Sequence, residues 1–568
     1  MALPDMHSLR ERWCQDPLFM VAAAAWFLYP FMGGLYYPWQ WGTALGINGC
    51  ILALIVLRRR EICLSAEWQT VLCFLIMGAG AFWNLAYGLD KDAAWMGVLR
   101  LAGWLLFALL IWQWPVGARR NLISLVPVSG ALMVVVSVAA GQVPAWRPLF
   151  YETNRLSGPF QYANTFALFL LVGLVVKPPP GPRPVRWGLW GILLFGLVAT
   201  GSRGGLLLFV LWFLFHRRPT RWALAGFLAM AAVVGIVAVL QNGWVFARFL
   251  QADSLSTVWG RLLYMKDGLK LLLQHPLGVG NLGWFYLQRM IQTGVYNVRY
   301  VHNDWLQMAL DYGTPAALAL LMLVVRRLRS GALELAAGCL IALHCLIDPD
   351  LEFQCMVLVW ILCLNPCRDA EPIKLKTPVL AAIPLVIAAG MLPRTAADFS
   401  FRFGYGMETK LASLDTEYAI QQMLQTATLS GAAQQARTIL EHNAFVPVAW
   451  EILAEDALSR GAYEDMADAQ WQAVVLLKYD QTVYDEALVR LRTAQRQGWD
   501  SAAAAEQMNR LLEFSDATMA ATDPIAWKLR DQPDIGFSAQ TRLLIHMQQL
   551  SNTSSIAASE STDTEGNS

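Results

Sequence analysis

Long apolar runs follow one another along this chain from about residue 18 to residue 392. Each run is close to the ~20 residues that an α-helix needs to cross the hydrocarbon core of a bilayer. Charged residues make up only 15% of the sequence, whereas a soluble globular chain has about 25%. The pattern predicts an all-α polytopic membrane protein with about thirteen transmembrane helices. The predicted spans are 18–37, 39–57, 66–87, 93–113, 121–141, 160–176, 186–201, 204–216, 222–240, 304–325, 332–347, 351–365 and 376–392.

Lysine and arginine are divided unequally between the two alternating sets of short loops. One set carries 19 of these cations, and the other carries 4, namely Lys91, Arg147, Arg155 and Arg203. Because cytoplasmic loops are enriched in Lys and Arg, the bias predicts a cytoplasmic N-terminus at 1–17. The first apolar run is long enough to remain as an anchor and lacks a small-x-small cleavage site. The loop at 241–303 and everything after residue 392 are then expected outside the membrane.

The loop at 241–303 is the longest polar interruption between the apolar runs. It carries six cations and two acids, and it ends in the sequence YVHNDWLQMALDYG, where the chain re-enters the apolar region. A cationic pocket with one titratable base at a membrane surface suits a lipid-linked substrate that bears phosphate. The cations are Arg248, Arg261, Lys266, Lys270, Arg289 and Arg299, and the acids are Asp253 and Asp267.

The composition changes after Arg394, and apolar residues recur there at three- and four-residue spacing, which predicts helices. A weak repeat of about 30 residues places Gly431 near Gly461, and residues 449–474 resemble a tetratricopeptide helix–turn–helix unit. We therefore expect an outer helical repeat domain at 395–550, with an irregular helical bundle as the alternative. Residues 551–568 are rich in Ser, Thr and acids without an apolar anchor, which is typical of disorder.

His302 is the first candidate for chemistry, because an imidazole can accept a hydroxyl proton near neutral pH. It lies where the loop re-enters the membrane, and its neighbours Asn303 and Asp304 can orient the ring. The alternative is an interfacial histidine that caps the helix starting near Asp304.

Three arginines are candidates for binding phosphate, since the guanidinium fork matches phosphate oxygens. Arg203 stands in ATGSRGG, where Gly204 and Gly205 allow a ligand close to the backbone. Arg155 precedes a span, and Arg261 begins an amphipathic segment at 258–273 that can lie on the bilayer surface. The alternatives are snorkelling for Arg203, interface anchoring for Arg155 and headgroup contact for Arg261.

Other polar residues have simpler explanations. His275 precedes Pro276 and is expected in a turn, and His344 is expected to pair with Asp348 inside a span. Arg100 lies inside the fourth span and is either a site residue or paired internally. We expect no cofactor and no metal, because no nucleotide-binding motif or Cys/His metal-ligand spacing occurs. The sequence GVGNLG does not open a βαβ unit, so a dinucleotide site is not expected.

Four stretches together resemble the O-antigen ligase and polymerase family of bacterial membrane glycosyltransferases. They are NRLSGPFQYANTFA, TGSRGG, WGRLLYMKDGLKLLLQHPLGVGNLGWF and VHNDWLQMALDYG, and they cover about residues 150–315. The resemblance implies transfer of a glycan from undecaprenyl diphosphate to an acceptor hydroxyl on the outer face of the cytoplasmic membrane. His302 would be the general base, and Arg203, Arg261 and Arg155 would hold the diphosphate.

The resemblance leaves the acceptor open, because ligases, polymerases and protein O-oligosaccharyltransferases of this kind share the site. The implied partners are the undecaprenyl-diphosphate-linked glycan, a glycan, lipid or protein acceptor, and membrane lipids, with no nucleic acid. Residues 407–550 are expected to bind the acceptor or an envelope-assembly partner. The alternatives from other classes are a small-anion, bicarbonate-like transporter and a non-catalytic assembly scaffold.

Overall fold

The structure is a computed structural model that describes residues 16–65, 67–216, 255–365, 370–374 and 378–531, together with residues 235 and 542. The predicted span at 222–240 and the predicted disordered tail at 551–568 lie outside the described residues. The chain divides into two compact units, which are described separately. The first contains residues 1–254, 272–281 and 300–413, and the second contains residues 255–271, 282–299 and 414–568.

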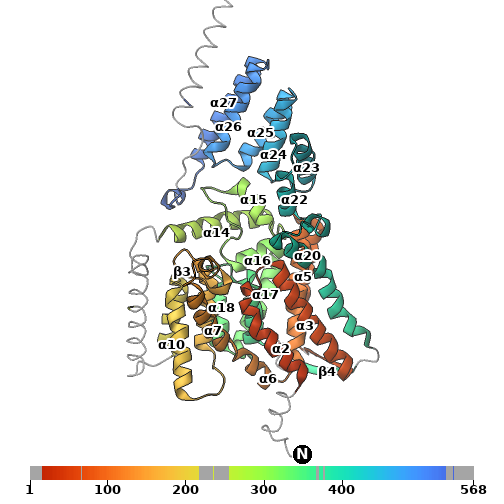
Figure 1. The fold of residues 1–568 in the computed structure, drawn as a ribbon, viewed down its shortest axis with the longest axis vertical. Helices are drawn as coiled ribbons and strands as arrows, with labels where there is room; N and C mark the ends of the chain where they lie inside the picture. Colours follow the sequence, from red (N-terminus) through yellow and green to blue (C-terminus); the bar gives the residue numbers. More distant parts are fainter. Residues whose placement is uncertain are drawn as a thin grey trace, which may run out of the picture. The chain divides into compact units, whose positions relative to one another are not determined.

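The first unit is a bundle of helices with short 3-10 turns and two small antiparallel sheets (Figure 1). Its α-helices are α2 (Pro17–Leu28), α3 (Pro38–Arg59), α4 (Trp68–Tyr87), α5 (Lys91–Trp112), α6 (Val116–Ile123), α7 (Val126–Ala140), α8 (Arg147–Phe150), α9 (Ala163–Val175), α10 (Arg183–Ala199), α11 (Arg203–His216), α16 (Asp304–Tyr312), α17 (Thr314–Arg329), α18 (Leu335–His344), α19 (Gln354–Leu364), α20 (Ala382–Phe403) and α21 (Glu408–Leu411). Its strands are β1 (Glu61–Ser65), β2 (Tyr151–Glu152), β3 (Arg155–Leu156) and β4 (Ala370–Lys374). Its 3-10 turns are η1 (Tyr29–Phe31), η2 (Gly33–Leu35), η3 (Gly158–Phe160), η5 (Asp350–Glu352) and η6 (Pro378–Ala381).

Every predicted span within the described residues contains one helix or consecutive helical segments, although several boundaries differ. Five helical stretches among those residues are long and apolar enough to cross a membrane. These stretches indicate a multi-pass helical membrane protein, while the count of thirteen spans stays a prediction. The five are Pro38–Arg59, Trp68–Tyr87, Lys91–Trp112, Val116–Ala140 and Val379–Phe403.

Small residues allow the long helices to pack closely. α3 lies along α20, as Figure 1 shows, and a Cβ atom added at Gly49 would stand only 2.9 Å from the Pro384 carbonyl oxygen. Glycine at such a position lets two backbones approach, which is the usual basis of helix association in membranes. α20 also continues to Phe403, beyond the predicted end of the last span at residue 392.

Loops that the charge bias assigns to one side of the membrane contact one another. β1 and β4 pair antiparallel, with Glu61 opposite Lys374. The buried Arg327 donates to Glu67 at 2.9 Å, and the buried Arg119 donates to the side chain of Asn365 at 2.5 Å. These contacts join residues on four different connections, while the side of the membrane on which they lie stays a prediction.

Gly313 divides the predicted span 304–325 into α16 and α17. Its φ is 90°, which favours glycine, and a Cβ there would lie 2.8 Å from the Leu277 carbonyl oxygen. The neighbouring Val279 N–H donates to the Leu310 carbonyl at 2.7 Å. The glycine-rich sequence after His275 therefore packs its backbone against the break in the helix.

α18 and α19 are both short, and the residues between them carry three acids. Asp348, Asp350 and Glu352 are buried, with 5% exposure or less. Acidic side chains at such positions in a membrane protein are rare and are usually paired or functional. This segment replaces the start of the predicted span 351–365, because the chain turns at Asp350–Glu352 before α19 begins.

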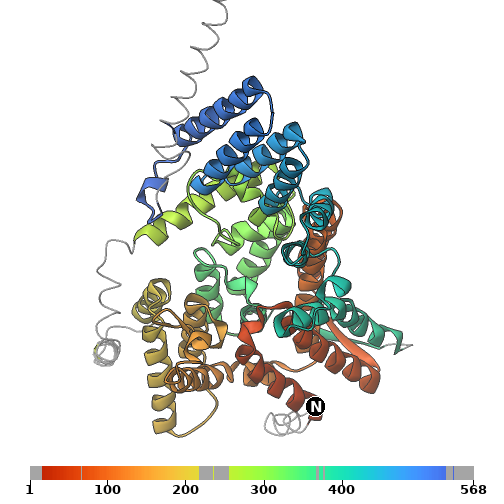
Figure 2. The same ribbon diagram turned by 45° about the horizontal axis from the view of Figure 1, so that its top comes forward.

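The second unit consists of helices that lie side by side in Figure 2. Residues of α24 to α27 form its apolar core, which includes Met466, Tyr484 and Leu511. Its α-helices are α14 (Ser256–Gln274, of which residues after Leu271 group with the first unit), α15 (Gly283–Ile291), α22 (Thr416–Leu424), α23 (Leu429–His442), α24 (Pro447–Ser459), α25 (Tyr463–Leu476), α26 (Gln481–Arg496) and α27 (Ser501–Ala520), followed by the 3-10 turn η7 (Ala526–Lys528).

The two glycines aligned in the predicted repeat do not occupy equivalent positions. Gly461 lies in the turn between α24 and α25 with a φ of 72°, whereas Gly431 lies inside the first turn of α23. α24 and α25 do form the helix–turn–helix predicted for residues 449–474. The tetratricopeptide assignment as a whole stays a prediction.

Candidate functional site

Asp348 is the centre of a buried polar network in the first unit. It is 1% exposed. Its Oδ1 accepts hydrogen bonds from the Tyr162 hydroxyl at 2.6 Å and from Asn164 Nδ2 at 3.1 Å. The same oxygen lies 3.8 Å from His302 Nδ1. One carboxylate thus joins the start of α9 to the candidate base.

His302 precedes α16 in a left-handed backbone conformation, with a φ of 55°. Such a conformation is uncommon for a residue other than glycine and often marks a functional position. Its side chain is 23% exposed, so the ring is accessible while one nitrogen faces the buried Asp348. The imidazole therefore has a carboxylate within 3.8 Å on one side and is partly exposed.

The neighbours expected to orient His302 have other roles. The Asn303 side chain accepts from the Leu306 N–H at 3.0 Å and so caps α16. Asp304 accepts from the Leu351 N–H at 3.0 Å and ties α16 to the acidic segment. The carboxylate beside the imidazole is Asp348, which is remote in sequence.

Arg155 lies in β3, and its guanidinium is buried, with 7% of the side chain exposed. Its Nε donates to the Thr200 carbonyl at 2.9 Å, and one terminal nitrogen donates to the Asn164 side chain. The other terminal nitrogen lies 3.4 Å from Glu152, whose side chain is 41% exposed. Arg155 therefore links the Asp348 network, through Asn164, to the TGSRGG segment.

Arg203 is the first residue of α11 and is half-buried. The Ser202 hydroxyl accepts from the Gly205 N–H at 3.3 Å, as a helix cap does. A Cβ atom at Gly204 would lie 3.5 Å from His344 Nε2. The TGSRGG segment thus runs beside His344 and Arg155, at a helix N-terminus that favours anions.

His344 is fully buried, and its principal partner differs from the prediction. Its Nδ1 lies 2.5 Å from Asp350 Oδ2, whereas its Nε2 lies 4.0 Å from Asp348. The other Asp350 oxygen accepts from the Thr165 hydroxyl at 2.8 Å. His344 is close to Asp348, as predicted, but its shorter contact is to Asp350.

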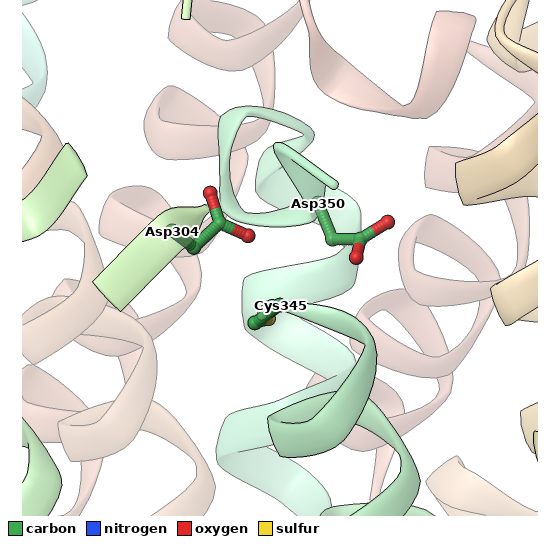
Figure 3. A group of neighbouring side chains, drawn as sticks. All are labelled: Asp304, Cys345 and Asp350. Carbon is green, nitrogen blue, oxygen red and sulfur yellow. The ribbon is translucent and has the colours of Figure 1, made fainter. Parts of the chain in front are cut away.

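Asp304, Cys345 and Asp350 are neighbours (Figure 3), and their ligand atoms lie within 4.8 Å of one another. Such a spacing can hold a metal ion. However, both carboxylates already accept hydrogen bonds, Asp304 from Leu351 and Asp350 from His344 and Thr165. We interpret the group as a set of hydrogen-bonded residues that connects α16, α18 and the acidic segment.

Arg100 has an internal partner, which was one of its two predicted explanations. Its terminal nitrogens lie 3.1 and 2.9 Å from the two carboxylate oxygens of Glu352. This bidentate pair fixes the acidic segment to α5. His275 lies in a turn, as expected, because the Gly278 N–H donates to its carbonyl at 2.9 Å.

Arg261 lies on α14 in the second unit. The helix buries Leu263, which is 0% exposed, and leaves Val258, Leu262 and Leu269 between 43% and 51% exposed. α14 is thus amphipathic, with an exposed apolar stripe beside its cations.

Several residues that connect the candidate residues were not predicted from the sequence. They are Tyr162, Asn164, Glu352 and Asp348, the last as the partner of His302. One signal was available, because the acids of DPDLE interrupt two apolar runs. The structure brings Arg155, the Arg203 segment and His302 into one network, and Arg261 belongs to the other unit.

The described residues define a helical membrane protein whose broken helices enclose a network of histidine, arginine and carboxylate. Residues 188–321 match the family model described as O-antigen ligase. The matched segment contains Arg203, Arg261 and His302, and Arg155 precedes it. The match supports a multi-pass membrane protein with a glycan-transferring, glycosyltransferase-like activity. No curated protein matches the chain.

Proposed function

We propose that the protein transfers a glycan from undecaprenyl diphosphate to an acceptor hydroxyl on the outer face of the cytoplasmic membrane. The observation that carries the proposal is the pairing of His302 Nδ1 with Asp348 at 3.8 Å, inside a network that reaches the TGSRGG segment. The O-antigen ligase match over residues 188–321 supplies the class of reaction.

In this proposal, His302 is the general base. A carboxylate next to Nδ1 favours the tautomer that carries its proton on Nδ1 and leaves Nε2 able to accept the acceptor's proton. The acceptor oxygen then forms the new glycosidic bond, and the bond to the lipid diphosphate breaks. Asp348 stabilises the imidazolium that results.

The arginines bind the diphosphate that leaves. Arg203 adds its guanidinium to the N-terminus of α11, where backbone N–H groups also favour anions. Arg155 can contribute through the terminal nitrogen that contacts the partly exposed Glu152, because a phosphate can replace that carboxylate. Arg261 is the third cation, and the exposed apolar stripe of α14 suits a helix on the membrane surface.

The proposal is tested with purified protein in lipid nanodiscs, given an undecaprenyl-diphosphate-linked oligosaccharide and an acceptor. Mass spectrometry of the product and of the released undecaprenyl diphosphate measures transfer. We expect both products from wild-type protein and only traces from His302→Ala. Equal turnover by the two proteins would contradict the assignment of the base.

The acceptor is identified in cells that lack the gene. Mass analysis of envelope lipids, polysaccharides and proteins should show one glycosylated class missing and the lipid-linked donor accumulating. Normal levels of every glycosylated class and of the donor would count against glycan transfer altogether.

A further inference from the structure

The second unit contains a pocket that the proposed transfer does not use. Its volume is about 330 Å³, and residues of α15, α22 and α24 line it, together with the end of α25. Phe285, Tyr286, Phe445 and Pro447 supply aromatic and aliphatic walls. A mainly apolar cavity with a few polar groups is the usual form of a small-ligand site.

Arg289 lines this pocket without a compensating hydrogen bond at Nε. Within the described part of the chain, that buried nitrogen has no hydrogen-bond partner. Burial lowers the pKa of Arg289, while Tyr286 and Glu451 act in the opposite direction. Arg289 is half-buried and lines the pocket, so the accessible part of a guanidinium whose hydrogen bonding within the protein is incomplete can meet a ligand acceptor.

The other charges at the pocket are engaged differently. Arg299 lies 3.7 Å from Glu417 and over the ring of Phe285, 5.9 Å from its centroid. Burial raises the pKa of Glu451, with Glu486 adding to the rise. Glu451 acts on Arg289 as a nearby charge, and the salt bridges of the described residues do not include a pair between these two, so the guanidinium can meet an anion.

We propose that this pocket binds an acidic sugar residue, a ring that carries a carboxylate. A guanidinium fork matches a carboxylate, and the aromatic walls offer flat surfaces to the faces of the ring. The side chain of Gln421 and the carboxylate of Glu417 can hydrogen-bond hydroxyl groups. A cavity of about 330 Å³ suits one sugar ring better than an extended peptide, which needs a continuous groove.

This assignment rests on the proposed function, because it takes the ligand from the glycan that is transferred. It adds acidic glycans as the substrate class of that function, because the guanidinium of Arg289 strengthens the binding of a carboxylate and not that of a neutral sugar. The pocket is formed by two parts of the chain that group in the second unit, because α15 comes from the loop at 241–303 and α22 and α24 belong to the C-terminal part.

The test compares three soluble probes on the full-length protein in nanodiscs by isothermal titration. They are an oligosaccharide that contains glucuronic acid, the same oligosaccharide with its carboxyl groups reduced, and a glutamate-rich peptide of similar length. We expect the acidic oligosaccharide to bind at least about tenfold more tightly than its reduced form, the size of effect of a charge-assisted hydrogen bond.

Variants assign the binding to the pocket. Arg289→Gln should abolish the preference for the acidic form, and Arg289→Lys should retain part of it. Phe445→Leu should weaken both oligosaccharides by a similar factor, because it removes a wall without changing charge. Arg496→Gln, on an exposed part of α26, should behave as wild type. Thermal unfolding checks that each variant is folded.

Equal affinity for the acidic and reduced oligosaccharides, or an unchanged preference in Arg289→Gln, would overturn the proposal. Peptide binding that matches the acidic oligosaccharide and is lost in Arg289→Gln would also overturn it, and would indicate a peptide site. These measurements involve no turnover. A failure of the transfer reaction, assayed separately with a neutral glycan, would count against the proposed function and not against the pocket.

Discussion

His302 Nδ1 lies 3.8 Å from Asp348 Oδ1, although three helices, α16, α17 and α18, separate the two residues in the sequence. The carboxylate is almost fully buried, and the imidazole is partly exposed. In the proposed mechanism, this carboxylate is the group that would hold the imidazole in one tautomer for proton transfer.

Asp348→Asn should therefore reduce transfer by about 10²-fold or more, near the contribution of a general base. Tyr162→Phe is the matched control, because it removes a 2.6 Å hydrogen bond to the same carboxylate without touching His302. We expect the control to lose less than about tenfold. Similar losses in the two variants, measured as initial rates, would mean that Asp348 acts through packing alone.

The helices at the predicted spans could be predicted from the sequence, since they follow from apolar runs, and the C-terminal helices could be predicted from apolar residues at three- and four-residue spacing. The residues His302, Arg203 and Arg155 could also be proposed as candidates, because they stand at the ends of such runs. The partner Asp348 could not be assigned, because nothing local connects it to His302. The break at Gly313 was missed for a related reason, since its cause is the backbone near Leu277, which packs against it.

The boundary between the membrane part and the C-terminal part could likewise be predicted only approximately from the sequence. Composition changes after Arg394, but α20 continues to Phe403. Segments of the loop at 241–303 group with the C-terminal helices through contacts such as the pairing of Lys266 with Asp523. Such long-range contacts leave no periodic signal in the sequence.

Arg203→Lys should remain impaired, because lysine keeps the charge and loses the bidentate fork. We expect Arg203→Ala to be weaker still, with the defect in use of the lipid-linked donor. The measurement is the dependence of the transfer rate on donor concentration, with membrane insertion checked by abundance in the membrane fraction. Donor dependence identical to wild type in both variants would remove Arg203 from the diphosphate site.

A chelator should not change turnover of the purified protein, because the carboxylates of Asp304 and Asp350 are already hydrogen-bonded. Asp304→Asn should lower the free energy of unfolding by about 1–3 kcal/mol, the cost of disturbing a buried hydrogen bond. Turnover that falls with chelator and recovers with added zinc or magnesium would instead assign a metal to the group in Figure 3.

Lys478 gives the second unit a pH-dependent stability. Burial lowers its pKa from 10.5 to about 8. Below pH 8 the charged amine therefore lowers the free energy of unfolding. That cost declines as pH rises from 8 towards 10.5, where the unfolded lysine also loses its proton. Lys478→Met should thus raise stability at pH 7 by about 1 kcal/mol, and by less at pH 9.5. Thermal unfolding at the two pH values measures this, and a gain that does not shrink at pH 9.5 would contradict the burial of the amine.

The most direct test of the account is the rate of glycan transfer by His302→Ala in nanodiscs, measured beside wild type and His275→Ala. His275 is an exposed turn residue, so its variant controls for loss of an imidazole from the same region. We expect a fall of about 10²–10⁴-fold for His302→Ala, with little change for His275→Ala and similar protein abundance for all three. Transfer by His302→Ala at the wild-type rate would contradict the central claim that this histidine is the base.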